Sequence, residues 1–217
     1  MTNNTTNYIP ALRFNWLTKL YNPLMAFTMP EVKFKKALIE QANIKDNHRV
    51  LDFGVGTATL SLLLKKTVPG SSITGVDVDD KVLSIAKKRI EENKAEITLT
   101  KYDGLKLPYQ NNSFDRVITS LVFHHLTPEQ KHNSLKEIKR VLKQNGELHI
   151  ADWGKASSAL MRLLFYFVQL LDGFKTTTDN VKGLMPAYIE NAGFKKVEIQ
   201  NNYSTIFGTL TLYKAVK

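Results

Sequence analysis

Two glycines and an aspartate stand where an apolar run gives way to a helical pattern, in RVLDFGVGTATLSLLLKK (residues 49–66). Asp52 belongs to the apolar run, and Gly54 and Gly56 follow it in alternation. Glycine lacks a Cβ and tolerates positive φ, so such a turn lets a ligand lie close to the backbone. Dinucleotide binding would require G-x-G-x-x-G, and Thr59 occupies the third position. The turn indicates a small-molecule site other than a dinucleotide, or a tight turn that holds no ligand.

Further acidic residues follow two other apolar runs. Asp77 comes 21 positions after Gly56, where a carboxylate can accept hydrogen bonds from both hydroxyls of a ribose; Asp79 or Asp80 then caps the next helix. Asp103 and Gly104 follow the third run, where a carboxylate can accept a hydrogen bond from an exocyclic amine. Polar turns are the alternative at both places. Because the carboxyl ends of parallel strands share one edge of a sheet, we expect these residues to converge on one ligand.

The elements that must position these residues follow from hydrophobic periodicity. Short runs rich in Val, Ile and Leu alternate with segments of helical period, which predicts a doubly wound α/β fold with a mostly parallel sheet. The expected strands are residues 49–53, 72–78, 96–102, 115–121 and 147–152. The expected helices are residues 57–66, 80–93 and 128–143, the last closed by Asn145-Gly146, with two more near 13–20 and 31–41. Residues 196–204 and 209–216 are expected to add an antiparallel C-terminal pair, which makes seven strands.

Composition sets the class of protein. The 217 residues suffice for a single domain, and the absence of cysteine excludes disulfides, thiolate metal sites and cysteine nucleophiles; no metal site is expected. The lack of cysteine, of a signal-like N-terminus and of an 18-residue apolar run is compatible with the cytoplasm. The net charge of +10 would suit nucleic acid or an anionic membrane, but lysine pairs scattered along the chain equally describe solvated helix faces.

Four blocks in order carry a more specific resemblance: VLDFGVGTATLS, GVDVDD, YDGLKLPYQNNSFDRVITSLVFHHL and EIKRVLKQNGELHIADWG. They resemble the class I S-adenosylmethionine-dependent methyltransferases, in particular the small-molecule branch with ubiquinone/menaquinone-type and phospholipid N-methyltransferases. The likeness covers residues 49–154 strongly and the C-terminal segment more loosely. It implies a Rossmann-like methyltransferase fold, S-adenosyl-L-methionine as the methyl donor and S-adenosyl-L-homocysteine as the product.

The resemblance also implies roles for residues of the first two blocks. Gly54 and Gly56 would flank the methionine part of the cofactor, and Asp52 would reach its amino group directly or through water. Asp77 would hold the ribose hydroxyls. Ala58 stands where the family's first motif has its third glycine, so the backbone approach there is expected to be less close.

For the later blocks, the resemblance implies that Val78 packs on the adenine. Asp103 would receive the adenine amine, aided by the Gly104 amide. Ser120 and Leu121, at the tip of the fourth strand, would line the sulfonium end of the cofactor.

Catalysis in such an enzyme rests on aligning an acceptor and excluding water, and a base is needed where an oxygen or carbon acceptor must lose a proton. The candidates are His124 and His125 after the fourth strand and Asp152 at the tip of the fifth. The histidines could instead only fix a loop or pack beside the cofactor. Asp152 could instead only cap the helix that follows it.

The acceptor side is expected outside the core at residues 48–154, in an N-terminal helical cap (1–47) and in residues 155–217. Residues 159–171 are almost wholly apolar, which indicates a buried helix, a lid or a helix lying on a membrane. Residues 172–180 are expected to form a polar loop that closes over a pocket. Tyr21 resembles a tyrosine that some relatives fold over the cofactor.

Several acceptors and functions stay open at this point. The apolar segments and positive charge suit an apolar or amphipathic small molecule at an anionic membrane, such as a quinone precursor or a lipid head group. A nucleic-acid acceptor is disfavoured because TSLVF at the fourth strand lacks the Asn/Asp-Pro-Pro-aromatic signature of base-modifying relatives. The remaining alternatives are a cofactor-binding partner protein without turnover and an NAD-type oxidoreductase on a similar sheet.

Overall fold

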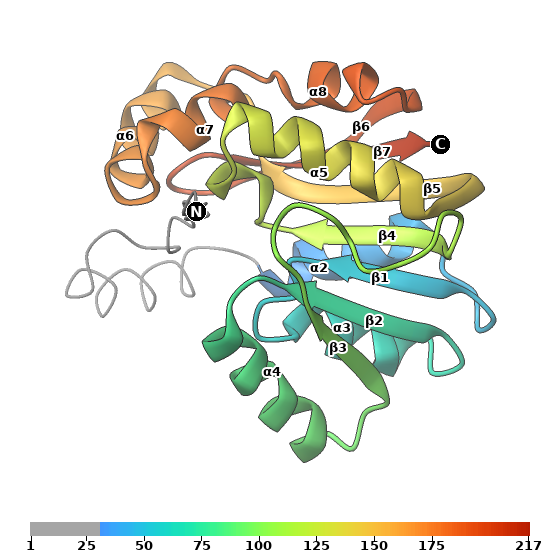
Figure 1. Ribbon diagram of the computed structural model, residues 1–217. Coiled ribbons are helices and arrows are strands. Elements are labelled where there is room, and N and C mark those ends of the chain that lie inside the picture. Colours follow the sequence, from blue (N-terminus) through green and yellow to red (C-terminus); the bar gives the residue numbers. More distant parts are fainter. Residues whose placement is uncertain (1–30) are drawn as a thin grey trace, which may run out of the picture.

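The computed structural model describes residues 31–217, and the expectations for residues 13–20 and for Tyr21 lie outside this range (Figure 1). Its centre is a seven-stranded sheet in the order β3-β2-β1-β4-β5-β7-β6. β7 runs antiparallel to both of its neighbours, and the other strands are parallel, which confirms the predicted fold class. The strands are β1 (Arg49–Phe53), β2 (Ser72–Asp77), β3 (Ile97–Lys101), β4 (Phe114–Ser120), β5 (Leu142–Trp153), β6 (Lys195–Ser204) and β7 (Thr209–Val216).

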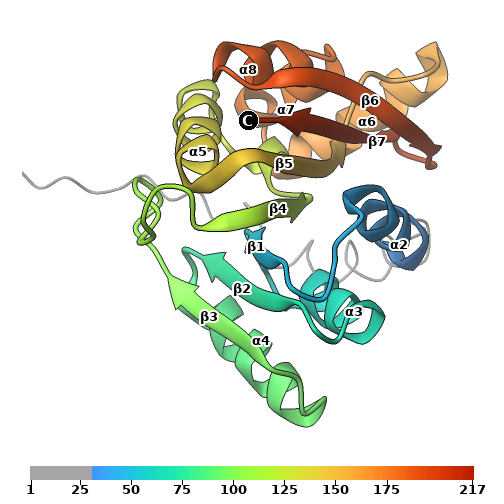
Figure 2. The same ribbon diagram turned by 90° about the vertical axis from the view of Figure 1, so that its right-hand side faces the viewer.

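Helices cover both faces of this sheet, as Figure 2 shows for α2 and α3 on one side and α5 and α8 on the other. α4 packs with α3 over β3. α6 and α7 lie beyond the carboxyl end of β4, at the left of Figure 1. The helices are α2 (Glu31–Ala42), α3 (Thr59–Thr67), α4 (Asp80–Glu92), η1 (Phe123–His125, a 3₁₀ turn), α5 (Pro128–Val141), α6 (Ala159–Asp172), α7 (Phe174–Val181) and α8 (Met185–Asn191).

The local sequence explains why these elements begin where they do. β1 is buried from its second residue onward because helices cover both of its faces, and this is why it reads as a continuous apolar run. Asp79 caps α4 by accepting from the Lys81 and Val82 amides, as expected. Thr127 and Gln130 form a reciprocal capping box at the start of α5.

Two expected boundaries are wrong. The helix expected over residues 128–143 ends at Val141, and Leu142 already pairs with Phe114 of β4. Asn145-Gly146 therefore does not close a helix but lies in an irregular stretch of β5, between this pair and the next one, Arg116 with Glu147. Asn145 adopts φ +61° there. A left-handed asparagine before a glycine can form an irregularity in a strand as well as the end of a helix.

The polar loop expected over residues 172–180 is also wrong, because Phe174–Val181 form helix α7. Thr176, Thr177 and Asn180 are buried, with spacing that places them on one helical face. The Thr177 hydroxyl donates to the Gly173 carbonyl at 2.6 Å. Threonine side chains whose hydroxyls donate to backbone carbonyls of the preceding turn can thus lie on the buried face of a helix. A search for apolar periodicity does not detect such a helix.

Candidate active site

The turn between β1 and α3 forms an open cradle at the carboxyl edge of the sheet. Gly54 and Gly56 have φ values of +70° and +55°, and Ala58 follows at +62°. The Gly54 amide donates to the Val76 carbonyl at 2.9 Å, and the Gly56 amide to Asp77 Oδ2 at 3.0 Å. A Cβ built on Gly56 would meet no atom nearer than the Gly54 carbonyl oxygen at 4.0 Å. The backbone at Gly56 is therefore open to a ligand.

Gly54 is glycine for a different reason. A Cβ at this position would lie 2.4 Å from Val122 Cγ2, so the turn packs directly against the segment that follows β4. Ala58 is fully buried, and its methyl group faces the core beneath the turn, where it packs with Ala86 and Ile90 of α4. Alanine in place of the family's third glycine is thus explained by the packing of α3 on α4.

Asp77 joins the ends of β1 and β2. Its Oδ1 accepts from the Val78 amide at 2.8 Å and the Asp79 amide at 3.1 Å, while Oδ2 accepts from Gly56. Three backbone donors thus fix one carboxylate at the strand tip. The predicted partners Gly56, Asp77 and Val78 are brought together by direct hydrogen bonds.

Asp52 lies beneath the same turn, with a residue exposure of 1%. Burial raises the pKa of its carboxyl group to about 6, although the Ser61 hydroxyl donates to Oδ2 at 2.6 Å and opposes the shift. Ser61, on the first turns of α3, is a partner that sequence reasoning missed. No spacing rule indicates it, because the contact depends on how α3 leaves the turn.

The third strand tip completes the edge. The Asp103 Oδ1 atom accepts from the Leu105 and Lys106 amides, which hold the pKa of this exposed carboxyl group below its ordinary value. Gly104 has φ +79°, and a Cβ built on it would lie 3.6 Å from Val78 Cγ1. Val78 and Gly104 therefore lie close together between the tips of β2 and β3.

At the tip of β4, Leu121 adopts φ +60° and its amide donates to the Ala151 carbonyl at 2.8 Å. The hydroxyl groups of Thr119 and Ser120 are buried and have no hydrogen-bond partner among the described residues. A buried hydroxyl without a partner is uncommon and indicates a group that a ligand or water completes. Ser120 is one of the residues predicted to line the sulfonium end.

Asp152 and His124 form a buried pair beside this strand tip. The His124 Nδ1 atom lies 2.8 Å from Asp152 Oδ1, and Asp152 Oδ2 accepts from the Val122 and Phe123 amides. Burial opposes charge on both groups, but their mutual attraction outweighs it, raising the pKa of His124 and lowering that of Asp152. The alternative that Asp152 caps the next helix is wrong, because Ser158 caps α6.

His125 and Asp172 complete the cluster. The His125 ring lies on the His124 ring, with centroids 3.9 Å apart, and burial lowers the pKa of His125 to about 3. Asp172, the last residue of α6, places Oδ2 3.9 Å from His124 Nε2, and burial raises the pKa of Asp172 to about 6. Sequence reasoning missed Asp172, because it was assigned to a loop.

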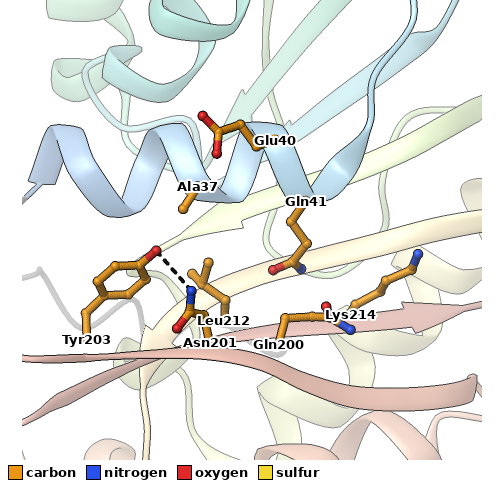
Figure 3. A pocket seen from close by; sticks show the side chains of 8 residues that line it. All are labelled: Ala37, Glu40, Gln41, Gln200, Asn201, Tyr203, Leu212 and Lys214. Atoms are coloured by element: carbon orange, nitrogen blue, oxygen red, sulfur yellow. Dashed lines mark hydrogen bonds between the residues drawn. The ribbon is translucent and has the colours of Figure 1, made fainter.

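A separate cavity of about 310 Å³ lies on the sheet face between α2 and the strands β6 and β7 (Figure 3). Glu40 and Gln41 line it from α2, and Gln200, Asn201 and Lys214 from the strands. None of the residues predicted for the cofactor lines it. The cradle at the strand tips is instead an open edge of the sheet.

Comparison with known proteins agrees with this geometry. The model of the methyltransferase domain family matches residues 50–146. The chain is 29% identical over 154 residues to demethylmenaquinone methyltransferase of Thermus thermophilus, covering 70% of this chain and 69% of that protein. It is 32% identical over 133 residues to demethylmenaquinone methyltransferase of Thermotoga maritima, covering 61% and 55%. These matches support a class I S-adenosylmethionine-dependent methyltransferase. It spans between about half and two thirds of the length of these relatives.

Solved structures show the same fold for this methyltransferase at lower identity. A SAM-dependent methyltransferase from Aquifex aeolicus matches with a TM-score of 0.63 and 19% identity, covering 93% of this chain and 97% of that one. Phosphoethanolamine N-methyltransferase 2 of Haemonchus contortus matches with a TM-score of 0.68 and 18% identity, covering 85% and 52%. At this identity the solved structures show the fold alone. The methyltransferase family match supports S-adenosylmethionine as the cofactor, and nothing supports the dinucleotide alternative.

Proposed function

We propose that the chain transfers a methyl group from S-adenosylmethionine to a small apolar or amphipathic acceptor of the hydroquinone type. The observation that carries the cofactor half is the cradle at Gly56, where the backbone is open and Asp77 is fixed beside it. The acceptor class is supported by the relatives, which are named as demethylmenaquinone methyltransferases. When bound, the cofactor supplies a methyl group already activated by a sulfonium.

The cofactor-binding residues are assigned by their places along the edge. Asp77 would accept the ribose hydroxyls and Val78 would pack on the adenine. Asp103 would receive the adenine amine, aided by the Gly104 amide. Gly54, Gly56 and Asp52 would hold the methionine part, and Leu121 would stand beside Ser120, whose unpartnered hydroxyl fits a polar group of the ligand. The chain's own contribution is to orient the donor and to exclude water.

On the acceptor side, we assign different tasks to the three candidate bases. Asp152 accepts from the backbone amides of Val122, Phe123 and Trp153 and from His124, so its role is to position the η1 turn. His124 is held by that contact. His125 belongs to the same turn and is less buried than His124, so it is the histidine proposed to lie on the acceptor side. Residues 155–217 would supply the rest of the acceptor side.

The acceptor class is tested by incubating the protein with methyl-labelled S-adenosylmethionine and three separate acceptors: a prenylated hydroquinone, an ethanolamine phospholipid and a mixed RNA. Label in the hydroquinone product alone supports the proposal. Transfer to the phospholipid or the RNA assigns a different acceptor. Binding of S-adenosylhomocysteine without transfer to any of them supports a cofactor-binding partner without turnover.

Contact with an anionic membrane belongs to the same proposal. No helix within residues 31–217 is long and apolar enough to cross a bilayer. α6 nevertheless leaves large apolar side chains in water, with Leu163 63% and Leu170 62% exposed. Arg162 lies beside them with its guanidinium over the Tyr166 ring. An exposed apolar face with basic residues suits the surface of an anionic bilayer, where a long-tailed quinol resides.

Vesicle sedimentation tests this contact. Vesicles with one third phosphatidylglycerol should retain the protein, and pure phosphatidylcholine vesicles should retain much less. Leu163→Asp with Leu170→Asp should reduce retention at least fivefold. Ile85→Asp is the control, because Ile85 is also 51% exposed but lies on α4. Equal retention of the double variant and the control would contradict the proposed membrane face.

A further inference from the structure

Two histidines and a carboxylate meet where η1 faces the end of α6. One ligand atom from each of His124, His125 and Asp172 lies within 4.8 Å of the others. From this juxtaposition we infer that the three residues form a site for a divalent transition-metal ion of the zinc class. Two imidazole nitrogens and one carboxylate oxygen are a donor set that such ions accept, and three protein ligands leave a coordination position open.

The orientation of His124 supports this assignment. Asp152 faces Nδ1 at 2.8 Å, and a ring that donates this N–H to a carboxylate directs the lone pair of Nε2 the other way. Nε2 faces Asp172 Oδ2 at 3.9 Å, which is too long for a hydrogen bond. Metal–nitrogen and metal–oxygen bonds of about 2.0–2.2 Å each would span this distance with one ion between the two atoms.

The contact between Asp152 and His124 is the kind of support that metal-binding histidines commonly receive. A carboxylate on the second ring nitrogen fixes the orientation of the ring and makes it a better donor to the metal. Asp152 is itself held by the Val122 and Phe123 amides, so the support is rigid. Such a carboxylate–histidine arrangement is a second observation, independent of the three converging atoms.

Charge in this region also favours a cation. The side chains of Asp152 and Asp172 are buried, with 0% and 3% exposure. Nearby Lys131 directs its ammonium group to the Thr176 carbonyl at 2.7 Å and to Asp179 at 3.3 Å. Within residues 31–217, His124 is the only basic group within 4.0 Å of the Asp172 carboxylate. Buried carboxylates are stable when paired or when they bind a metal ion.

A role for the metal ion in catalysis rests on the methyl transfer proposed above. η1 follows the β4 tip, and Val122, two residues before His124, lies against Gly54 of the cofactor cradle. The open position of the metal would take a hydroxyl oxygen of the hydroquinone. The metal stabilises the oxygen in its deprotonated form while the proton passes to water. The metal would thus supply the activation for which His124, His125 and Asp152 were the candidate bases.

Cobalt binding tests the site without relying on turnover. The full chain, purified without a histidine tag, is treated with a chelator, dialysed and titrated with Co²⁺ while visible absorption is recorded. We expect d–d bands that saturate at one Co²⁺ per chain and disappear when Zn²⁺ is added. Asp172→Asn and His125→Gln should each weaken Co²⁺ binding roughly 10- to 100-fold, and Asp152→Asn should do so by a similar factor.

His132→Gln is the matched control, because His132 lies on α5 outside the cluster, and its affinity should stay within twofold of the wild type. Circular dichroism of each variant separates lost binding from lost folding, and Asp172→Glu, which keeps the carboxylate, should retain part of the affinity. The absence of Co²⁺ bands overturns the metal site, as does Asp172→Asn binding like the control. Normal binding of S-adenosylhomocysteine in the same samples would leave the proposed methyl transfer standing.

Discussion

Asp77→Asn tests the cofactor cradle with one atom changed. In the wild type, Oδ1 accepts from the Val78 and Asp79 amides and Oδ2 accepts from the Gly56 amide. An asparagine carbonyl can keep the first two bonds, but its NH₂ group would then face the Gly56 N–H, a donor opposite a donor. The variant therefore keeps the end of β2 while losing its link to the glycine turn and the anionic acceptor proposed for the ribose.

The size of the effect follows from these bonds. A hydrogen bond to a charged group contributes about 1.5–3 kcal/mol, so the loss of one ribose contact should weaken ligand binding by roughly 10- to 150-fold. One unmet backbone donor at Gly56 costs the fold about 1 kcal/mol, or roughly 2–4 °C in Tm for a chain of this size. The expected signature is a large loss of affinity with a small loss of stability.

Isothermal titration with S-adenosylhomocysteine measures the affinity, and thermal unfolding measures the stability. Asp79→Asn is the matched control: it removes the same charge two residues away, and asparagine caps a helix about as well as aspartate. Its affinity should stay within about twofold of the wild type. If Asp77→Asn binds as tightly as Asp79→Asn, Asp77 does not hold the ribose and the cradle has been assigned wrongly.

Four further substitutions probe the supports of the site and one ion-pair cluster of the sheet by urea unfolding. Gly54→Ala should destabilise by roughly 2–4 kcal/mol through left-handed strain and the clash with Val122, and Val122→Ala should relieve only the clash. Ser61→Ala should cost about 1–3 kcal/mol at pH 8 and less at pH 5, because Asp52 ionises in the folded state near pH 6. Glu147→Gln removes a carboxyl group whose pKa is lowered to about 2 by hydrogen bonds from His149 and Lys214. The variant should lose about 1–2 kcal/mol of unfolding free energy above pH 4.5, and this loss should vanish toward pH 2. A deficit independent of pH in the last two variants would contradict these assignments.

The parallel core could be predicted because its strands are visible in the sequence as short apolar runs. Helices cover both faces of β1, so nearly every residue of this strand is apolar. The expected bounds of residues 49–53 agree with the structure. The strand pair at residues 209–216 and 196–204 was predicted to within one residue for a different reason. β6 is an exposed edge strand, and two β-prone runs joined by a short segment with Gly208 indicated the pair. The predicted end of α5 was wrong because an Asn-Gly pair occurs both at helix ends and at irregularities in strands, as at Asn145-Gly146.

The cofactor edge was also within reach of the sequence. Its residues lie at the end of a strand or one or a few positions beyond it, and topology alone brings parallel strand tips together. The structure joins Gly56 to Asp77 and faces Gly104 toward Val78, although these residues are far apart along the chain. What the spacing did not reveal was Ser61, because its contact depends on the direction in which α3 leaves the turn.

The acceptor side depends on contacts that no local pattern encodes. His124, which follows β4, contacts Asp152 of the neighbouring strand β5 and lies near Asp172 at the end of α6. The cluster therefore forms only when α6 has packed over the edge of the sheet. One signal was nevertheless present in the sequence. An acid that ends an otherwise apolar helix is either exposed at its end or buried with a partner, and the structure decides for the second, because the Asp172 side chain is 3% exposed. In the proposed site a metal ion would pair with Asp172, and the paired histidines of VFHHL would bind that ion with it.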